Sequence, residues 1–252
     1  MTQPVGPIAG GDAIGSANPL LDAWEGADLE RPDPQLRSRL LSRYSFAVPT
    51  EPALMSVAGE TTEAGILEIG AGTGYWAHLL RLHGVDVLAT DPAPAPSRSN
   101  RWFAGSQPWT DVVAADHRIV AQHADRTLLI IWPTKNEVWA AEALELYWEA
   151  GGQTVIYVGE QPGGRTGDDL FHALLGEYDR CWGCSFGIVT MPCICGVRPR
   201  FRRERNITLP HWPGFSDDLL IYRRITDGVQ LQPSAGRRGA RSWWRDRAAQ
   251  AA

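Results

Sequence analysis

Short apolar runs alternate with helically spaced apolar positions through the middle of the chain. The runs that predict buried strands are 65–69, 85–90, 111–115, 127–132 and 154–158. Between and after them, apolar residues recur at helical spacing over 75–82, 137–149 and 168–175. Strands buried on both faces are apolar throughout, and their alternation with helices is typical of parallel sheets. The pattern predicts a doubly wound, Rossmann-like α/β fold with a mostly parallel sheet.

Helically spaced apolar residues before this alternation predict an N-terminal helical cap. They occur over 20–24 and 36–41, and Pro32 and Pro34 interrupt the spacing between the two groups. A third, short helix is expected at 51–58. These helices precede the first predicted strand, so we expect them to pack against one end of the α/β domain.

Two strands after the alternation, at 201–209 and 219–224, predict a C-terminal antiparallel hairpin that completes the sheet. The turn Pro213-Gly214 lies between them. The chain is thus expected to comprise a disordered lead-in, a helical cap, an α/β domain with a cysteine-rich insert, and a flexible basic tail. The corresponding ranges are 1–19, 20–60, 61–226 with the insert at 181–195, and 227–252.

A glycine-rich turn connects the first predicted strand to the helix that starts at Tyr75. It contains Gly70, Gly72 and Gly74, whose alternate spacing lets the backbone bend sharply and approach a ligand closely. The dinucleotide fingerprint Gly-x-Gly-x-x-Gly would require glycine at position 75, where tyrosine is bulky. Glu68, just before the turn, would repel a pyrophosphate but suits a cationic ligand.

Asp91 ends the second predicted strand, where it can accept hydrogen bonds from two ribose hydroxyls. Glu68, the three glycines and Asp91 together resemble motif I and the acidic strand-two residue of class I S-adenosylmethionine-dependent methyltransferases. The resemblance covers residues 60–225 and implies S-adenosylmethionine as the cofactor. A nicotinamide dinucleotide site and a purely structural turn stay open as alternatives. The expected cofactor-binding residues are Glu68, Gly70, Ala71, Gly72, Gly74, Tyr75, Trp76, Asp91, Pro92, Asp116 and Trp132.

Two of these residues follow later strands and each has two interpretations. Ligands bind outside the carboxyl ends of the strands in this architecture, which brings Asp116 and Trp132 to one crevice. Asp116 is either an acceptor for the adenine amino group, as the resemblance implies, or a helix N-cap. Trp132 either lines the crevice, as a wall for a flat acceptor or beside the sulfonium, or packs in the core. The run Trp132-Pro133-Thr134-Lys135 departs from the Asn/Asp-Pro-Pro-aromatic run of enzymes that methylate nucleobases, which disfavours a nucleobase acceptor.

Methyl transfer from a sulfonium is an in-line displacement, so alignment of the acceptor and exclusion of water supply much of the rate. A general base is needed only for an alcohol or a protonated amine. Glu160, at the end of the fifth strand, is the best-placed carboxylate, and Tyr44, His117 and His172 are further candidates. By the resemblance, Tyr44 and Phe46 are also candidate lid residues; alternatively they anchor the N-terminal helices.

All four cysteines lie within fifteen residues, in the pattern Cys-x2-Cys-x8-Cys-x-Cys. Four thiolates can bind one zinc ion tetrahedrally. The second pair is spaced more tightly than in an ordinary zinc ribbon, so buried free thiols and a redox pair stay open beside structural zinc. The candidate zinc ligands are Cys181, Cys184, Cys193 and Cys195.

A net charge of -5 indicates no general attraction to nucleic acid or membrane. No apolar run approaches the roughly 18 residues that span a bilayer, and the N-terminus lacks the pattern of a signal peptide. We expect a cytoplasmic protein with reduced thiols, of undetermined oligomeric state, that methylates oxygen or nitrogen of a small molecule. The alternatives are an RNA or protein acceptor docked by the cysteine-rich insert and the arginines of the tail, and a non-catalytic nucleoside-binding module.

Overall fold

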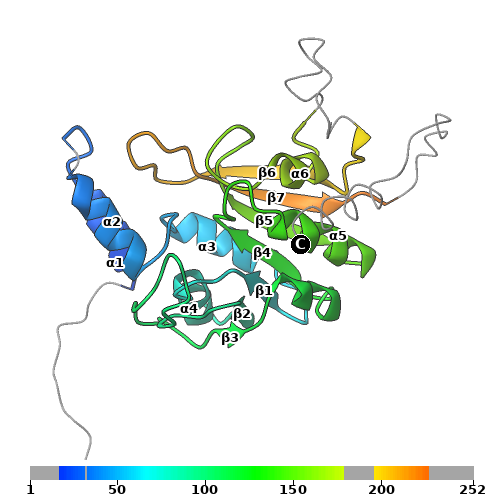
Figure 1. Cartoon of the computed structure of the whole chain (residues 1–252), viewed down its shortest axis with the longest axis horizontal. Helices are drawn as coiled ribbons and strands as arrows, with labels where there is room; N and C mark the ends of the chain where they lie inside the picture. The colour runs from blue at the N-terminus through cyan, green and yellow to red at the C-terminus, as the bar shows by residue number, and fades with distance from the viewer. Residues whose placement is uncertain (1–16, 32, 179–195, 227–252) are drawn as a thin grey trace, which may run out of the picture.

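The computed structural model describes residues 17–31, 33–178 and 196–226 (Figure 1). The four cysteines and the basic tail from 227 lie outside these ranges, so the predictions of a zinc site and of docking surfaces there stay predictions. The expected lead-in also lies outside them, except for its last residues. Helix α1 begins at Pro19, one residue earlier than the expected cap.

In the described part of the chain, seven strands form one sheet in the order β3-β2-β1-β4-β5-β7-β6. Strands β1 to β5 are parallel, and β7 is antiparallel to both of its neighbours. This doubly wound sheet with its closing hairpin is the fold that the resemblance to class I methyltransferases implies, and that prediction is confirmed. The strands are β1 (Ile66–Ile69), β2 (Val87–Asp91), β3 (Val113–Ala114), β4 (Thr127–Ile131), β5 (Thr154–Gly159), β6 (Phe201–Thr208) and β7 (Asp218–Arg224).

The winding direction reverses between β1 and β4, which pair directly along their whole length. From β1 the chain winds outward through β2 and β3, and from β4 it winds the other way through β5. Ligands in doubly wound sheets bind outside the carboxyl ends of the strands at such a reversal. The fold therefore brings the ends of β1, β2 and β4 together at one edge.

Each face of the sheet has its own apolar core, because successive side chains of a strand point to opposite faces. All residues of β1, β4 and β5 are buried. Helices α3 (Glu51–Ala58) and α4 (Tyr75–Leu82) cover one face. The 3-10 helix η1 (His117–Gln122) and helices α5 (Trp139–Glu149) and α6 (Asp169–Leu174) cover the other. No helix in the described ranges is long and apolar enough to cross a membrane.

The first three helices begin with the same capping arrangement. Asn18, Asp33 and Thr50 are the N-caps of α1 (Pro19–Glu25), α2 (Pro34–Arg43) and α3, and each side chain accepts a backbone N–H of the first turn. A proline follows each cap at the first or second helical position, where its missing N–H costs no hydrogen bond. These signals explain why the helical cap is predictable from the sequence.

Three elements of the α/β domain begin two residues later than predicted. Strand β2 starts at Val87 and not at Val85, because the Val85 amide donates a hydrogen bond to the Leu80 carbonyl at the end of α4. Strand β3 is two residues long, since only Thr90 and Asp91 of β2 pair with it. Helix α5 begins two residues after the predicted position 137, because the chain before it is held in the connection from β4.

Candidate active site

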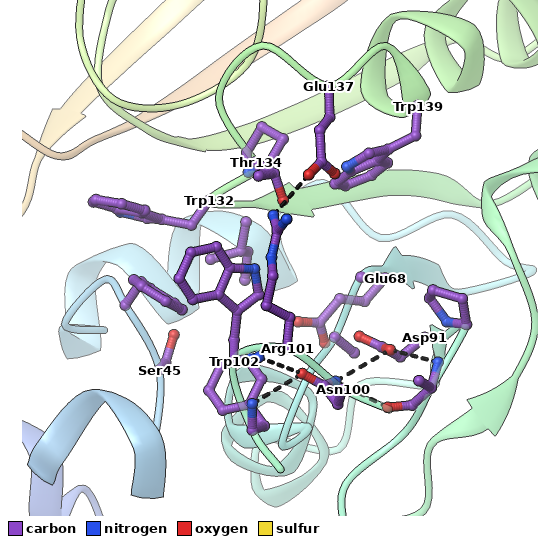
Figure 2. Close-up of a pocket in the computed structure, with 18 of the residues that line it drawn as sticks. Ser45, Glu68, Asp91, Asn100, Arg101, Trp102, Trp132, Thr134, Glu137 and Trp139 are labelled. Atoms are coloured by element: carbon purple, nitrogen blue, oxygen red, sulfur yellow. Dashed lines mark hydrogen bonds and ion pairs between the residues drawn. The ribbon is translucent and has the colours of Figure 1, made fainter. Parts of the chain in front are cut away.

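A cavity of about 880 Å³ opens at the carboxyl ends of β1, β2 and β4. Its walls come from the glycine-rich turn, the end of β2, the connection between β4 and α5, and the segment 92–107. Figure 2 shows Glu68 and Asp91 on one side of this space and Trp102 and Trp132 on the other. The crevice predicted from the strand ends is therefore present, and it is large enough for a ligand of nucleoside size together with a second small molecule.

The three glycines of the turn all have left-handed backbone conformations, with φ of 68°, 57° and 73°. Gly70 and Ala71 line the cavity. Gly72 and Gly74 lie behind the surface, where a Cβ at Gly72 would meet the Phe103 ring at 2.3 Å. The glycines are thus needed for the path of the chain and for close packing behind the turn.

Asp91 is nearly buried at the cavity wall, and three groups of the protein hold its carboxylate. The Gly72 amide donates to Oδ2 at 3.0 Å, and the Ala93 amide donates to Oδ1 at 2.8 Å. The side-chain amide of Asn100 approaches Oδ1 at 3.4 Å. A carboxylate has about four lone-pair positions, so Asp91 is oriented by the protein and retains acceptor capacity toward the cavity.

Glu68 lines the same wall and is 2% exposed. Its Oε2 has no hydrogen-bond partner among the described residues. Burial raises the pKa of the Glu68 carboxyl from 4.5 to about 8, against smaller opposing effects of the Ala77 amide and the Arg81 charge. A buried carboxyl oxygen without a partner is costly. A cationic group in the cavity would supply the missing partner and favour the carboxylate form.

Tyr75 and Trp76 fasten the N-terminal segment to the first turn of α4. The Tyr75 hydroxyl donates to the Asn18 side chain at 2.8 Å and accepts the Leu20 amide at 3.2 Å. The Trp76 indole N–H donates to the Ala47 carbonyl at 3.3 Å. Both side chains are almost completely buried, although they contribute to the inner wall of the cavity.

Tyr44 and Phe46, the candidate lid residues, both line the cavity. The Tyr44 ring is buried and stacks on Trp109 at 5.2 Å between centroids, and its carbonyl accepts the Thr73 hydroxyl. Phe46 stacks on the Trp132 ring at 5.0 Å. Tyr44 therefore has the predicted anchoring contacts, whereas Phe46 is part of an aromatic wall.

Trp132 has a left-handed backbone, with φ of 49°, directly after β4. Its indole N–H donates to Asp217 Oδ1 at 2.8 Å, and Asp217 is completely buried in the connection from β6 to β7. Burial raises the pKa of the Asp217 carboxyl to about 6. The ring of Trp132 is therefore held in one orientation at the cavity wall, as its pocket-lining interpretation requires.

The segment 92–107 forms a wall that the sequence patterns do not indicate. The Asn100 side chain donates to the Ala93 carbonyl and accepts the amides of Trp102 and Phe103, each at 2.9 Å. Arg101 reaches across to Glu137 at 2.6 Å, which joins this segment to the connection before α5 (Figure 2). Trp102 is 51% exposed at the cavity. An aromatic pair inside a proline- and serine-rich loop is the one signal that could have indicated this wall.

Asp116 and His117 lie at the cavity wall and already have partners within the protein. Asp116 caps η1, since its Oδ1 accepts the Arg118 amide at 2.9 Å and its Oδ2 pairs with the Arg118 guanidinium at 2.8 Å. These contacts lower the pKa of Asp116. His117 Nε2 lies 2.8 Å from Glu142 Oε2. Asp116 thus has the predicted N-cap role and also borders the cavity.

Glu160 does not reach the cavity, contrary to the prediction that made it the leading general base. Its carboxylate is buried and accepts the Ser216 amide at 3.1 Å and the Arg165 guanidinium at 3.0 Å. Arg165 lines the cavity in its place. His172 is buried against the Thr166 carbonyl at 2.9 Å and is likewise outside the cavity lining. The Glu160 and His172 side chains therefore stabilise the loop after β5 through their contacts with Arg165 and Thr166.

Metal binding is not indicated by the described part of the chain. None of its histidines, cysteines, aspartates or glutamates form a group of three that could hold a metal ion. Cys181, Cys184, Cys193 and Cys195 lie outside the described ranges, so the zinc prediction concerns residues beyond this search. The side chains that line the cavity include carboxyl, aromatic, hydroxyl and cationic groups.

No protein-family model matches the chain, and no curated protein matches it significantly. Among solved structures, magnesium protoporphyrin IX methyltransferase from Synechocystis PCC 6803 with bound S-adenosylmethionine matches at 12% identity, with a TM-score of 0.41, over 81% of this chain and 91% of that one. The 16S rRNA (adenine(1408)-N(1))-methyltransferase from Catenulisporales acidiphilia matches at 12% identity, with a TM-score of 0.37, over 72% of this chain and 94% of that one. These likenesses are too distant to assign a function, which is inferred from the residues of this chain.

Proposed function

We propose that the chain is an S-adenosylmethionine-dependent methyltransferase with a small-molecule acceptor. The observation that carries this proposal is the unpaired Oε2 of buried Glu68, in the same wall as the oriented carboxylate of Asp91. The cationic methionyl part of the cofactor would supply the partner that Glu68 lacks, and the ribose hydroxyls would donate to Asp91. When bound, the cofactor supplies an electrophilic methyl group on a sulfonium.

The nicotinamide alternative is disfavoured by the amides of the glycine-rich turn. Pyrophosphate binding needs backbone N–H groups that point at the ligand. Here the Ala71 amide donates to the Thr90 carbonyl at 2.9 Å, the Gly72 amide to Asp91 at 3.0 Å, and the Gly74 amide to the Ala71 carbonyl at 2.8 Å. The turn therefore has few donors left for an anion, and the ionised form of Glu68 would repel one.

The residues of the cavity serve chiefly to align the reactants and to exclude water. With the cofactor held by Glu68 and Asp91, the cavity walls would orient a lone pair of the acceptor oxygen or nitrogen toward the methyl group that the cofactor would supply. The rings of Phe46, Trp102 and Trp132 would shield the acceptor from water. For a hydroxyl acceptor, His117 beside Glu142 is the best-placed group in the cavity to take the proton.

A small acceptor is favoured over a nucleic acid by the pairing of the surface arginines on β6. Arg203 lies 3.5 Å from Glu177, and Arg205 pairs with Glu60. Arg202 lies 3.8 Å from Glu204 on the same strand. The described edge of the sheet therefore offers little unbalanced positive charge for a phosphate backbone. The alternative, an RNA or protein acceptor, rests on the insert and tail outside the described ranges.

Calorimetry with the full chain tests the cofactor. We expect S-adenosylmethionine and S-adenosylhomocysteine both to bind, and a nicotinamide dinucleotide not to bind. Glu68→Gln should weaken both nucleosides, whereas Arg39→Gln, a change on the exposed face of α2, should leave them unaffected. Binding of the dinucleotide alone would overturn the proposal. Binding of both nucleosides without methyl transfer to any acceptor would favour the non-catalytic module.

A further inference from the structure

Lys135 is the one lysine among the 24 lysine and arginine residues of the chain. It lies in the connection after β4 and lines the cavity. No hydrogen bond or ion pair joins its side chain to any other residue in the described ranges. The other cations of the cavity are paired, since Arg101 contacts Glu137 at 2.6 Å and Arg165 contacts Glu160 at 3.0 Å. Lys135 is thus a cation of this site that no described acid balances.

The backbone around Lys135 is held in an unusual conformation. Trp132 and Asn136 have positive φ values of 49° and 61°, and they are the only non-glycine residues with positive φ in the described chain. The Gly167 amide donates to the Pro133 carbonyl at 2.9 Å. Residues in this region of backbone space cost free energy and persist where the surroundings hold them. The connection therefore presents Lys135 from a fixed loop.

A short antiparallel contact joins the connection that carries Lys135 to the segment that carries a second cation, Arg165. Thr134 and Thr166 form an isolated antiparallel bridge. The next pair along these two segments is Lys135 and Arg165, and both residues line the cavity. Like charges carried on adjoining segments repel each other. An anion bound between the two side chains would remove that repulsion.

Arg165 is only partly neutralised by Glu160. Its Nη1 donates to Glu160 Oε1 at 3.0 Å and to the Gly214 carbonyl at 2.6 Å. Its Nε and Nη2 have no hydrogen-bond partner in the described part of the chain, and its side chain is 53% exposed. These donors are available to a ligand, and a guanidinium matches the geometry of a carboxylate.

The cavity lining combines acids, cations and aromatic rings. The acids Glu68 and Asp91 lie on one side, toward the proposed cofactor (Figure 2). Lys135 and Arg165 line the same cavity, and so do Trp132 and Phe46, whose rings stack at 5.0 Å between centroids. Flat rings and unsatisfied cation donors together suit a conjugated molecule with an anionic group.

We propose that the methyl acceptor is a flat aromatic carboxylate, and that Lys135 and Arg165 bind its carboxylate while Phe46, Trp102 and Trp132 contact its ring. This inference rests on the proposed function, because it assigns the acceptor of the same cavity. Lys135 and Arg165 are binding residues in this assignment and take no part in bond making.

Calorimetry on the full chain saturated with S-adenosylhomocysteine tests the assignment. The probes are 3-hydroxy-2-naphthoate and its primary amide, which share their ring and hydroxyl and differ in the charge of one group. We expect the carboxylate to bind at least about tenfold more tightly than the amide, because it forms charge-assisted hydrogen bonds. Equal binding of the two probes, or binding of neither, overturns the acceptor class.

Variants of Lys135 separate binding from folding, because Lys135 is exposed and its side chain has no described partner. Lys135→Gln should weaken the carboxylate about tenfold and leave the amide unchanged. Lys135→Arg should restore most of the loss, and Arg39→Gln on α2 should have no effect. An equal loss for both probes in Lys135→Gln would contradict a charge-specific role.

The affinity for S-adenosylhomocysteine distinguishes the two levels of the proposal. If Lys135→Gln binds S-adenosylhomocysteine as tightly as wild type but no longer prefers the carboxylate probe to the amide probe, both the cofactor and the acceptor assignment are supported. Binding of S-adenosylhomocysteine without any preference for the carboxylate overturns the acceptor class and leaves the proposed function intact. Failure of the wild-type chain to bind S-adenosylhomocysteine overturns both.

Discussion

At the residue scale, Glu68 combines nearly complete burial with an oxygen that has no described partner. Its pKa is raised from 4.5 to about 8, chiefly by burial. The neutral acid is therefore favoured in the free protein at neutral pH. A cation at the cavity wall favours the carboxylate instead, so the charge of this residue is expected to depend on the ligand.

Binding of S-adenosylmethionine at about pH 7 is expected to release close to one proton from Glu68, because the ligand favours the carboxylate. The affinity should accordingly rise as the pH increases from about 6 toward about 8. Calorimetry in two buffers with different ionisation enthalpies measures the proton release. Glu68→Gln is the matched control and should release no proton at this position. If the binding enthalpy depends on the buffer equally in wild type and variant, Glu68 is not the source of the proton.

The same residue predicts how stability depends on pH. A raised folded pKa means that the folded state holds its proton more tightly than the unfolded state, so stability is present below pH 4.5 and is lost as the pH rises toward about 8. Glu68→Gln should therefore be more stable than wild type at about pH 8.5, by on the order of 1–3 kcal/mol, and closer to it at about pH 5. Urea unfolding at both pH values checks this; a constant difference would count against it.

Asp91→Ala is expected to weaken cofactor binding by about 1–3 kcal/mol, because it removes the acceptor proposed for the ribose. The variant should also lose some stability, since the amides of Gly72 and Ala93 lose their acceptor. Calorimetry gives the affinity and thermal unfolding gives the stability. Asp91→Asn keeps the volume and separates the two effects; full affinity in both variants would remove Asp91 from the site.

At the scale of elements, the segment 92–107 acts as a wall of the cavity although it forms no helix or strand. Asn100 holds it, since its side chain bonds to Ala93, Trp102 and Phe103 and also approaches Asp91. One buried amide thereby couples the shape of the loop to the orientation of the acid. This dependence makes Asn100 the residue whose loss should disturb the whole wall.

Asn100→Ala is expected to lower stability by about 1–3 kcal/mol, because several buried polar groups lose their partners together. Cofactor affinity should fall with it, by about tenfold, since Asp91 loses part of its support. Arg98→Ala is the control, because Arg98 is exposed in the same segment. Thermal unfolding and calorimetry give both quantities; equal effects of the two changes would contradict a specific role of Asn100.

At the scale of the whole molecule, the net charge of -5 hides an uneven distribution. Lys135 lines the cavity without an ion-pair partner in the described ranges, whereas the arginines of β6 are matched by glutamates. The uncompensated positive charge of Lys135 therefore lies at the cavity. It favours a charged small molecule over a long polyanion.

Removal of residues 227–252 is expected to leave the affinity for S-adenosylhomocysteine unchanged, because every residue of the described cavity precedes them. Methyl transfer to a small acceptor should also keep its rate. Calorimetry and a labelled-methyl assay on the shortened chain measure the two. Loss of transfer to RNA or to a protein after this removal, with cofactor binding intact, would favour the macromolecular alternative.

The sequence by itself determined the doubly wound fold and the wall of the cavity that we propose for the cofactor, in which Glu68 and Asp91 are each within one residue of a strand end. Local pattern suffices there, because buried parallel strands, glycine turns and N-caps are encoded by neighbouring residues. The carboxyl ends of parallel strands then meet at one edge without further information.

Only the tertiary structure decided which polar groups face the cavity. Glu160 lies at a strand end as Asp91 does, yet its carboxylate accepts hydrogen bonds from Arg165 and Ser216 and does not line the cavity. The bridge between Thr134 and Thr166 joins the two segments that carry Lys135 and Arg165, and both residues line the cavity. The hydrogen-bond and ion-pair partners of these side chains come from distant parts of the chain. Which partner a side chain contacts is decided by packing, so it cannot be predicted from sequence spacing alone.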